Sequence, residues 1–419
     1  MSEPAPIPLA TLRGATLRDG RVVDVAIDGD TVVAVVDAGT LAPSPDGEVV
    51  DLTGYLLVTA PAEPHGHLDK ALSWDEIQPP FGDLERAVES WHAYSDAMRE
   101  TDILARARRA ARRMLAHGTT AVRSHVDLLP GPDPLRGVRA LVALREELRG
   151  LMDLELVALG GWQTPDEVFD AALDAGVDLV GGAPHLSPDT LGDLERVLAI
   201  ARRRGVGVDL HTDESLDGAQ TLSAYAETVA DWTVIRSAGH CVRLSTLEPH
   251  ALRATIDDVL RADIGLITLP ITNLYLQGWQ HEHAVPRGIA PVRQLLDAGV
   301  RVGAGADNIR DPFNPVGRCD ALETASLLVS AAHLPPDDAL TAVTDGARDV
   351  MGLPVAGPVI GARADLLAVR ATNVGEAVAF ADADRFVIHR GHLVSRTRVD
   401  GWTAASPSTL PTTSIGKRA

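Results

Sequence analysis

Lysine, cysteine and aromatic residues are all scarce in this sequence of 419 residues. The only two cysteines, Cys241 and Cys319, are too few for a disulfide framework. Aromatic residues make up 4% of the chain, which disfavours the stacking platforms used by proteins that bind single-stranded nucleic acid. No apolar run approaches the roughly 18 residues of a membrane span, and residues 1–8 lack the apolar core of a signal peptide.

Positive charge is in deficit as well. The chain has 38 lysines and arginines against 58 acidic residues, and the formal net charge of −20 would repel a phosphate backbone. Hydrophobic residues (45%) and charged residues (23%) occur at ordinary globular levels. We therefore expect a soluble, acidic, cytoplasmic protein whose partners are neither nucleic acids nor membranes.

Short strand-like segments separated by turn signals occupy both ends of the chain. These segments are residues 13–17, 22–27, 31–36, 364–369, 386–388 and 390–394, the last read as a turn into a strand. The similar texture predicts that the two ends pair into one small β-sandwich domain made of residues 1–59 and 356–400. Residues 401–419, rich in Ser, Thr and Pro, are expected to form a flexible tail.

The middle of the chain, residues 60–355, alternates between apolar strands and amphipathic helices. The expected strands are residues 56–60, 120–126, 154–159, 177–181, 207–211, 232–240, 264–269 and 301–306. The clearest helical stretches are residues 102–117, 134–149, 189–204, 249–262 and 291–298. Eight strand–helix repeats predict an α/β fold with a closed (β/α)8 barrel, and a doubly wound open sheet is the alternative.

Metal-competent side chains stand at the ends of four of these strands. His65 and His67 follow the first strand, and residues at i and i+2 of an extended chain point the same way. His211 ends the fifth strand, His240 ends the sixth, and Asp307 follows the eighth. The carboxyl ends of barrel strands meet at one mouth, whereas strands one and eight of an open sheet would lie too far apart to share a cation. The site and the barrel therefore support each other.

Five segments around these residues resemble the amidohydrolase superfamily, and most closely its cytosine deaminase-like branch. They are Glu63-Pro-His-Gly-His-Leu-Asp69, Arg123-Ser-His-Val-Asp127, Asp209-Leu-His-Thr-Asp-Glu214, Asn273-Leu-Tyr-Leu-Gln-Gly278 and Asp307-Asn-Ile-Arg-Asp-Pro312. The last segment also resembles N-isopropylammelide isopropylamidohydrolase, which removes an alkylamine from a triazine. The resemblance covers nearly the whole chain, including the split β domain.

The resemblance implies that His65, His67, His211 and Asp307 bind one Zn2+ or Fe2+ ion and that His240 holds the attacking water. Dinuclear members of the superfamily bridge two ions with a carboxylated lysine on a mid-barrel strand. The only lysines here are Lys70, just past the first strand, and Lys417 in the expected tail. A mononuclear site follows, and relatives of this kind commonly form homo-oligomers.

A divalent cation with an open position lowers the pKa of water from about 16 towards 7. Asp307 can then take the water's proton, while His240 stabilises the hydroxide and the developing oxyanion. Glu214 lies three residues beyond His211, and the resemblance makes it a proton shuttle to a ring nitrogen and the departing amine. The alternative for Glu214 is an ordinary surface or helix-capping carboxylate.

The leading hypothesis is therefore hydrolytic deamination of a small N-heterocycle such as a cytosine-like pyrimidine, a triazine or a pterin. The same centre could cleave another C–N bond, releasing an alkylamine or opening a cyclic amide. A non-catalytic scaffold would be expected to lack ligands, and none is missing.

Substrate contacts are less clearly marked. Gln163, His185, Asn308 and Phe313 follow strands and would face the mouth. Asn308 and Phe313 stand where cytosine deaminases carry aspartate and tryptophan, and Gln163 is displaced by about two residues, so cytosine itself is in doubt.

For several other residues near the expected mouth, the sequence allows more than one interpretation. His125 is expected to be either a substrate contact or a structural histidine, and Asn273 and Gln277 either pocket residues or loop caps. Lys70 is expected to be a solvated lysine at the rim, and contact with the substrate there is the alternative. Arg310 would pair with Asp311 or Glu214, or bind an anionic substituent.

Overall fold

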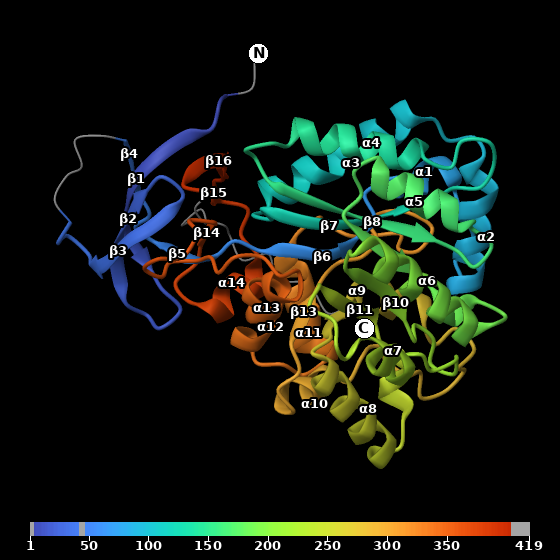
Figure 1. Ribbon diagram of the computed structural model, residues 1–419. Helices are drawn as coiled ribbons and strands as arrows, with labels where there is room; N and C mark the ends of the chain where they lie inside the picture. The colour runs from blue at the N-terminus through green and yellow to red at the C-terminus, as the bar shows by residue number, and fades with distance from the viewer. Residues whose placement is uncertain (1–3, 42–46, 404–419) are drawn as a thin grey trace, which may run out of the picture.

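Two sheets organise the chain, as Figure 1 shows. The computed structural model describes residues 4–41 and 47–403. One sheet has eight parallel strands, ordered β6 to β13 as in the sequence, with helices around it. The other is a mixed sheet formed by the two ends of the chain, where the blue and red strands of Figure 1 lie side by side. The expected barrel and the expected small β domain are both confirmed.

The mixed sheet has the strand order β16-β15-β14-β5-β1-β2-β3, with β4 beside β1. Because β16 also pairs with β1, the sheet folds back on itself around an apolar core that includes Leu12, Leu57 and Ile388. Its strands are β1 (Ile7–Thr16), β2 (Val22–Asp28), β3 (Thr31–Asp37), β4 (Glu48–Asp51), β5 (Tyr55–Thr59), β14 (Leu366–Arg370), β15 (Arg385–His389) and β16 (His392–Thr397).

The expectation that residues 56–60 form the first barrel strand is wrong. That segment is β5 of the mixed sheet, where Leu57 pairs with Ala368 of the antiparallel strand β14. The barrel begins at β6 (Ala62–Gly66), so His65 lies inside the first strand rather than after it. Both strands are fully buried, and the continuous apolar run of β5 suits a buried strand of either sheet. The sequence marks the change of sheet only by Pro61, which has no N–H for a ladder.

The other seven expected barrel strands are present, and each pairs in parallel with its neighbours. They are β7 (Ala121–Asp127), β8 (Asp153–Gly160), β9 (Leu179–Gly182), β10 (Val208–Thr212), β11 (Arg236–His240), β12 (Gly265–Thr268) and β13 (Val302–Ala304). The strand ends that carry the candidate ligands therefore meet at one mouth.

The five expected helices are confirmed, with small shifts at their ends. They are α3 (Glu100–Ala116), α4 (Arg136–Glu147), α6 (Thr190–Arg204), α8 (Pro249–Ala262) and α10 (Val292–Asp297). In α6 the apolar residues Leu194, Val197, Leu198 and Ala201 recur at helical spacing and are buried. Asp189 caps this helix by accepting a hydrogen bond from the backbone N–H of Gly192.

Further helices complete the barrel and its loops. They are α1 (Trp74–Ile77), α2 (Leu84–Ser95), α5 (Asp166–Asp174), α7 (Leu222–Val229), α9 (Pro270–Leu276), α11 (Ala321–Ala331), α12 (Pro336–Val343), α13 (Asp345–Val350) and α14 (Val374–Phe380), with the short 3₁₀ turns η1 (Pro184–Leu186) and η2 (Val242–Thr246). Within the described ranges, none of the helices has the length and apolar character needed to cross a membrane.

The expected domain boundaries, at residues 59/60 and 355/356, stay predictions. Of the expected tail, residues 401–419, the part from 404 onward lies outside the described residues.

A buried carboxylate joins the first and last strands of the barrel. Where β6 meets the end of β13, the backbone forms a single parallel bridge between Gly66 and Asp307. Beside it, the Glu63 carboxylate accepts hydrogen bonds from the N–H groups of Ala306 (2.8 Å) and His65 (3.2 Å). A Cβ at Gly305 would lie 2.0 Å from Glu63 Oε1, so the close approach of the carboxylate requires glycine there. Glu63 thus completes the barrel seam with its side chain.

We expect Glu63→Ala to lower the free energy of unfolding by about 2–5 kcal/mol, because it leaves two buried N–H donors without acceptors. The measurement is equilibrium unfolding of chelator-treated protein, so that bound metal does not contribute. The control is Glu195→Ala on the exposed face of α6, where a change within about 0.5 kcal/mol is expected. Equal stability of the two variants would show that the seam does not depend on Glu63.

Candidate metal centre and active site

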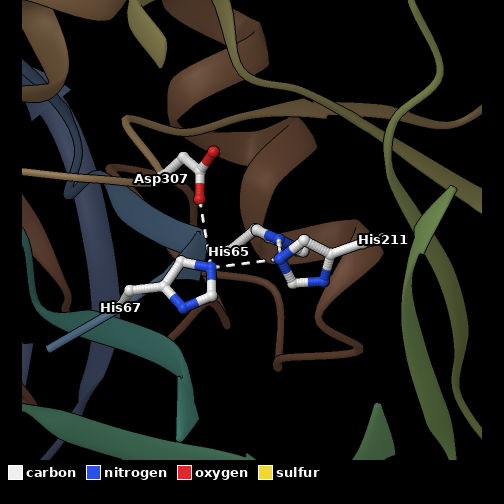
Figure 2. Close-up of side chains that lie close together, drawn as sticks. All are labelled: His65, His67, His211 and Asp307. Atoms are coloured by element: carbon white, nitrogen blue, oxygen red, sulfur yellow. Dashed lines mark hydrogen bonds and ion pairs between the residues drawn. The ribbon is translucent and has the colours of Figure 1, made fainter. Parts of the chain in front are cut away.

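Four side chains from three parts of the barrel converge at its mouth, as Figure 2 shows. His65 Nε2 and His67 Nε2 lie 3.3 and 3.1 Å from His211 Nε2. Asp307 Oδ1 lies 3.2 Å from His67 Nε2. The ligand atoms of the four residues are all within 4.8 Å of one another, and all four residues are buried. The structure therefore brings together the four residues that the sequence analysis selects as ligands.

The spacing of these atoms fits one cation. Nitrogen ligands about 2.0–2.1 Å from a tetrahedral metal ion are about 3.3–3.4 Å from each other, close to the distances found here. Both carboxylate oxygens of Asp307 and the Nε2 atom of His240 are buried without a hydrogen-bond partner. Buried polar atoms are normally satisfied, so this concentration of unsatisfied ones points to a bound group. The chemistry and spacing of the His/Asp cluster therefore fit a metal site.

The electrostatics of the site also call for a cation. Burial lowers the pKa of His65 to about 4 and the pKa values of His67 and His211 well below their usual range, so all three imidazoles are neutral, as metal ligands must be. Burial, with help from the Glu214 carboxylate, raises the pKa of Asp307 well above its usual range. An ionised Asp307 in this setting requires a neighbouring positive charge.

Backbone conformation and a glycine shape the site. His240 and Asp307 have φ values of +67° and +64°, in the left-handed region that non-glycine residues rarely adopt. Such conformations concentrate at functional sites, where the surrounding structure holds them. Gly239, the last residue before His240, lies against the His65 ring, and a Cβ there would come within 2.7 Å of its Cε1 atom. The residue at this point of β11 must therefore lack a side chain.

Glu214 lies between two imidazoles beside the candidate ligands. Its Oε1 is 3.5 Å from His240 Nδ1, and its Oε2 is 3.6 Å from His185 Nε2. Burial raises the pKa of Glu214, but His240 and His185 outweigh it, so the net shift is downward and the carboxylate is ionised. Asn273 donates from Nδ2 to His240 Nδ1 (3.0 Å), and Gln277 donates to the backbone oxygen of Glu214 (2.8 Å).

A cavity of about 730 Å³ opens onto these groups and is lined by His67, His211, Glu214, His240 and Asp307, among other residues. Of the four expected substrate contacts, Gln163, Asn308 and Phe313 line this cavity. His185 lies behind Glu214, and its Nδ1 is 3.2 Å from the backbone oxygen of His211. His125 is buried beside His65, with its Nε2 3.1 Å from His65 Nδ1.

The expectation that Lys70 is a solvated rim residue is wrong. Lys70 is only 4% exposed, and its Nζ donates to Asp127 Oδ1 at 2.8 Å. The Nζ also lies over the rings of Trp91 (5.6 Å) and Phe313 (5.3 Å) and 3.1 Å from His67 Nδ1. A carboxylate and two aromatic faces thus keep the charge inside the cavity wall.

Arg310 is placed away from the cavity. Its Nη2 donates to both oxygens of the exposed Asp75 carboxylate (2.7 and 2.8 Å), so the side chain meets neither Asp311 nor Glu214.

Sequence reasoning missed two residues of the cavity wall. Trp91, on α2, donates from Nε1 to Asp127 Oδ2 at 2.6 Å, and both residues line the cavity. Asp127 ends one of the motifs quoted above, so its position at the end of β7 could have marked it. Trp91 lies on a helix that the sequence analysis does not recognise, and no local signal identifies it.

Comparison with known proteins agrees with this geometry. The model of the Amidohydrolase family matches residues 87–404, about three quarters of the chain. The chain belongs to the amidohydrolase family. The match begins after His65 and His67, so those two ligands rest on the site geometry and on full-length relatives. The resemblance seen in the motifs is confirmed, and the protein is a hydrolase that acts on C–N bonds.

Three relatives cover nearly the whole chain. A pterin deaminase of Rhizobium rhizogenes is 30% identical over 94% of both chains. The solved structure of 5-methylcytosine deaminase from Klebsiella pneumoniae with 5-fluorocytosine has a TM-score of 0.84 at 25% identity and covers 94% of this chain and 99% of its own. N-isopropylammelide isopropylaminohydrolase from Burkholderia multivorans has a TM-score of 0.79 at 28% identity and covers 93% and 99%.

We expect His211→Ala to weaken Zn2+ binding by at least about 100-fold, because a ligand between His65 and His67 is lost. The measurement is competition with a coloured chelator, with folding checked by circular dichroism. The control, His250→Ala on the exposed face of α8, should bind as the parent does. Wild-type affinity in the His211 variant would exclude the site described here.

Proposed function

We propose that this amidohydrolase is a metal-dependent deaminase that releases ammonia from an amino-substituted N-heterocycle. His65, His67, His211 and Asp307 would hold one divalent ion, Zn2+ or Fe2+. The count of one rests on the four convergent ligands and on the lysine-poor sequence, in which the described barrel strands contain no lysine to bridge a second ion. A cytoplasmic location and a homo-oligomeric state stay predictions.

When bound, a divalent cation lowers the pKa of a water molecule from about 16 towards 7 and so supplies a nucleophile at neutral pH. Asp307, whose carboxylate oxygens have no hydrogen-bond partner, accepts the proton of the attacking water. His240 presents its free Nε2 atom, 3.9 Å from Asp307 Oδ2, and orients that water. Water supplies both protons that the reaction needs. Asp307 accepts one of them, and Glu214, which is ionised at the start, carries the other to the ring nitrogen. The proton held by Asp307 then passes through Glu214 to the leaving amine.

The observation that carries this proposal is the placement of Glu214. It lies on the cavity wall next to His240, buried and ionised, where it can receive a proton from the water and return it to the substrate. An unprotonated amino group would have to leave as the strongly basic amide anion, whereas a protonated one leaves as neutral ammonia, so deamination requires an acid at this position. A surface or capping role is not supported, because Glu214 is 3% exposed and makes no cap.

Within this class we propose a pterin-like, two-ring substrate. The cavity of about 730 Å³ lies within the range that holds ligands larger than a single small ring. The pterin deaminase relative supports the same choice. Asn308 stands 3% exposed beside the candidate ligands and Phe313 offers an aromatic face, whereas Gln163 lies at the exposed edge of the mouth. We propose that these three residues contact the ring.

Removal of an alkylamine from a triazine is the second candidate, supported by the similarity to N-isopropylammelide isopropylaminohydrolase. The deciding experiment is an ammonia-release and amine-release screen over pterins, aminopyrimidines and aminotriazines, with enzyme loaded with Zn2+ or Fe2+. Ammonia from pterins at the highest kcat/KM supports the proposal. Isopropylamine as the main product would replace it with the second candidate.

We expect Glu214→Gln to lower kcat for the confirmed substrate by about 10²–10⁴-fold, because the amide cannot carry a proton. Metal content and the unfolding transition should stay as in the parent. The matched control is Glu227→Gln, an exposed glutamate on α7 in the same strand–helix unit. Near-parental ammonia release by the Glu214 variant would remove the proton-shuttle assignment.

A further inference from the structure

A second buried cluster lies directly beneath the proposed metal centre. His65, His125 and Asp209 bring their side-chain nitrogens and a carboxylate oxygen within 4.8 Å of one another. Asp209 Oδ1 is 3.2 Å from His65 Nδ1 and 3.6 Å from His125 Nε2. His65 belongs to both clusters, with Nε2 facing the proposed ion and Nδ1 facing Asp209. The function of the second cluster therefore depends on the first.

The position of the proton on the His65 ring indicates the role of this cluster. A neutral imidazole carries one proton, on either Nδ1 or Nε2. If Nε2 offers its lone pair to the ion, Nδ1 carries the proton and must donate it. Two groups lie within hydrogen-bond distance of Nδ1, namely Asp209 Oδ1 at 3.2 Å and His125 Nε2 at 3.1 Å. A carboxylate is the stronger acceptor, because hydrogen bonds to an ionised group are stronger than those between neutral groups. A cation at the second cluster would need a lone pair on Nδ1 as well, which the neutral ring does not have.

Arg123 supplies the positive charge that the second cluster needs. Its Nη1 donates to Asp209 Oδ2 at 3.0 Å, and the side chain is 0% exposed. The same guanidinium donates to Glu155 Oε2, Ser237 Oγ and the backbone oxygen of Met351. Asp209 is thus an ionised carboxylate held in one orientation by a fully engaged arginine, and a fixed guanidinium repels a second cation.

We propose that Asp209 is a positioning residue: its carboxylate, held by Arg123, fixes the tautomer and the ring orientation of His65 for metal binding. Carboxylates that hold metal-bound histidines in this way raise metal affinity, and their removal costs about 10–100-fold. The inference rests on the metal ligation proposed above, and it does not depend on the substrate or on deamination.

The test compares Asp209→Asn, Asp209→Ala and Glu155→Gln. Asparagine keeps an acceptor oxygen but loses the charge, and alanine removes both. Glu155→Gln is the matched control, because Glu155 binds the same arginine from the far side and has no contact with His65. Zn2+ affinity is measured by chelator competition, ions per chain by elemental analysis, and ligand geometry by the visible bands of Co2+-loaded protein.

We expect Asp209→Asn to weaken Zn2+ binding by about 10-fold and Asp209→Ala by up to about 100-fold. Both variants should shift the Co2+ bands, and one ion per chain should remain at saturation. Glu155→Gln should match the parent in affinity and spectrum, even if it lowers the unfolding midpoint. If Asp209→Ala does not fold, the isosteric Asp209→Asn variant decides.

Three results would overturn the proposal. Parental affinity and spectrum in Asp209→Asn would show that the carboxylate does not position His65. An equal loss in Glu155→Gln would trace the effect to general weakening of the barrel interior. Loss of one of two ions in Asp209→Asn would make the cluster a second metal site. A separate result would remove the metal assignment itself. If the parent binds no ion, or if His211→Ala leaves ion binding unchanged, this inference fails together with that assignment.

Discussion

The meeting of the first and last barrel strands is the constraint on which the site depends. His65 and His67 belong to β6 and its end, while Asp307 follows β13. Only the closure of the barrel brings these distant segments into contact, since parallel strands deliver their carboxyl ends to a common mouth. The backbone ladder at this seam is short, and Glu63 supplements it with two hydrogen bonds from its side chain.

The interior of the mouth concentrates negative charge that the chain does not neutralise by itself. Glu214, which follows β10, and Asp307, which follows β13, both face the cavity, and each is nearly fully buried. Lys70 forms an ion pair with Asp127, and Arg123 forms ion pairs with Asp209 and Glu155, so neither neutralises Glu214 or Asp307. Burying a charged group without a partner costs free energy. The site therefore contains unsatisfied carboxylates and strained backbone, and a cation and a substrate would supply the missing partners.

Much of the fold and of the ligand set could be predicted from the sequence, because strand ends carry the chemistry and strand order sets their convergence. The errors have physical causes. Residues 56–60 and β6 are adjacent, buried strands that join different sheets, and sheet membership depends on pairing with distant segments. Lys70 is buried because Asp127, Trp91 and Phe313 surround it, and those contacts come from three separate segments.

The scarcity of lysine and the contacts of Arg123 both support the proposal of a single ion. The described barrel strands contain no lysine that could bridge a second ion, and β7 carries Arg123 beside the second cluster. A guanidinium stays protonated and cannot become a metal ligand, whereas it can hold a carboxylate through two or more directed hydrogen bonds. Arg123 thus already supplies the positive charge beside Asp209 that a second ion would otherwise supply. The proposed single ion would be bound by His65, and the fixed charge of Arg123 secures the orientation of that histidine through Asp209.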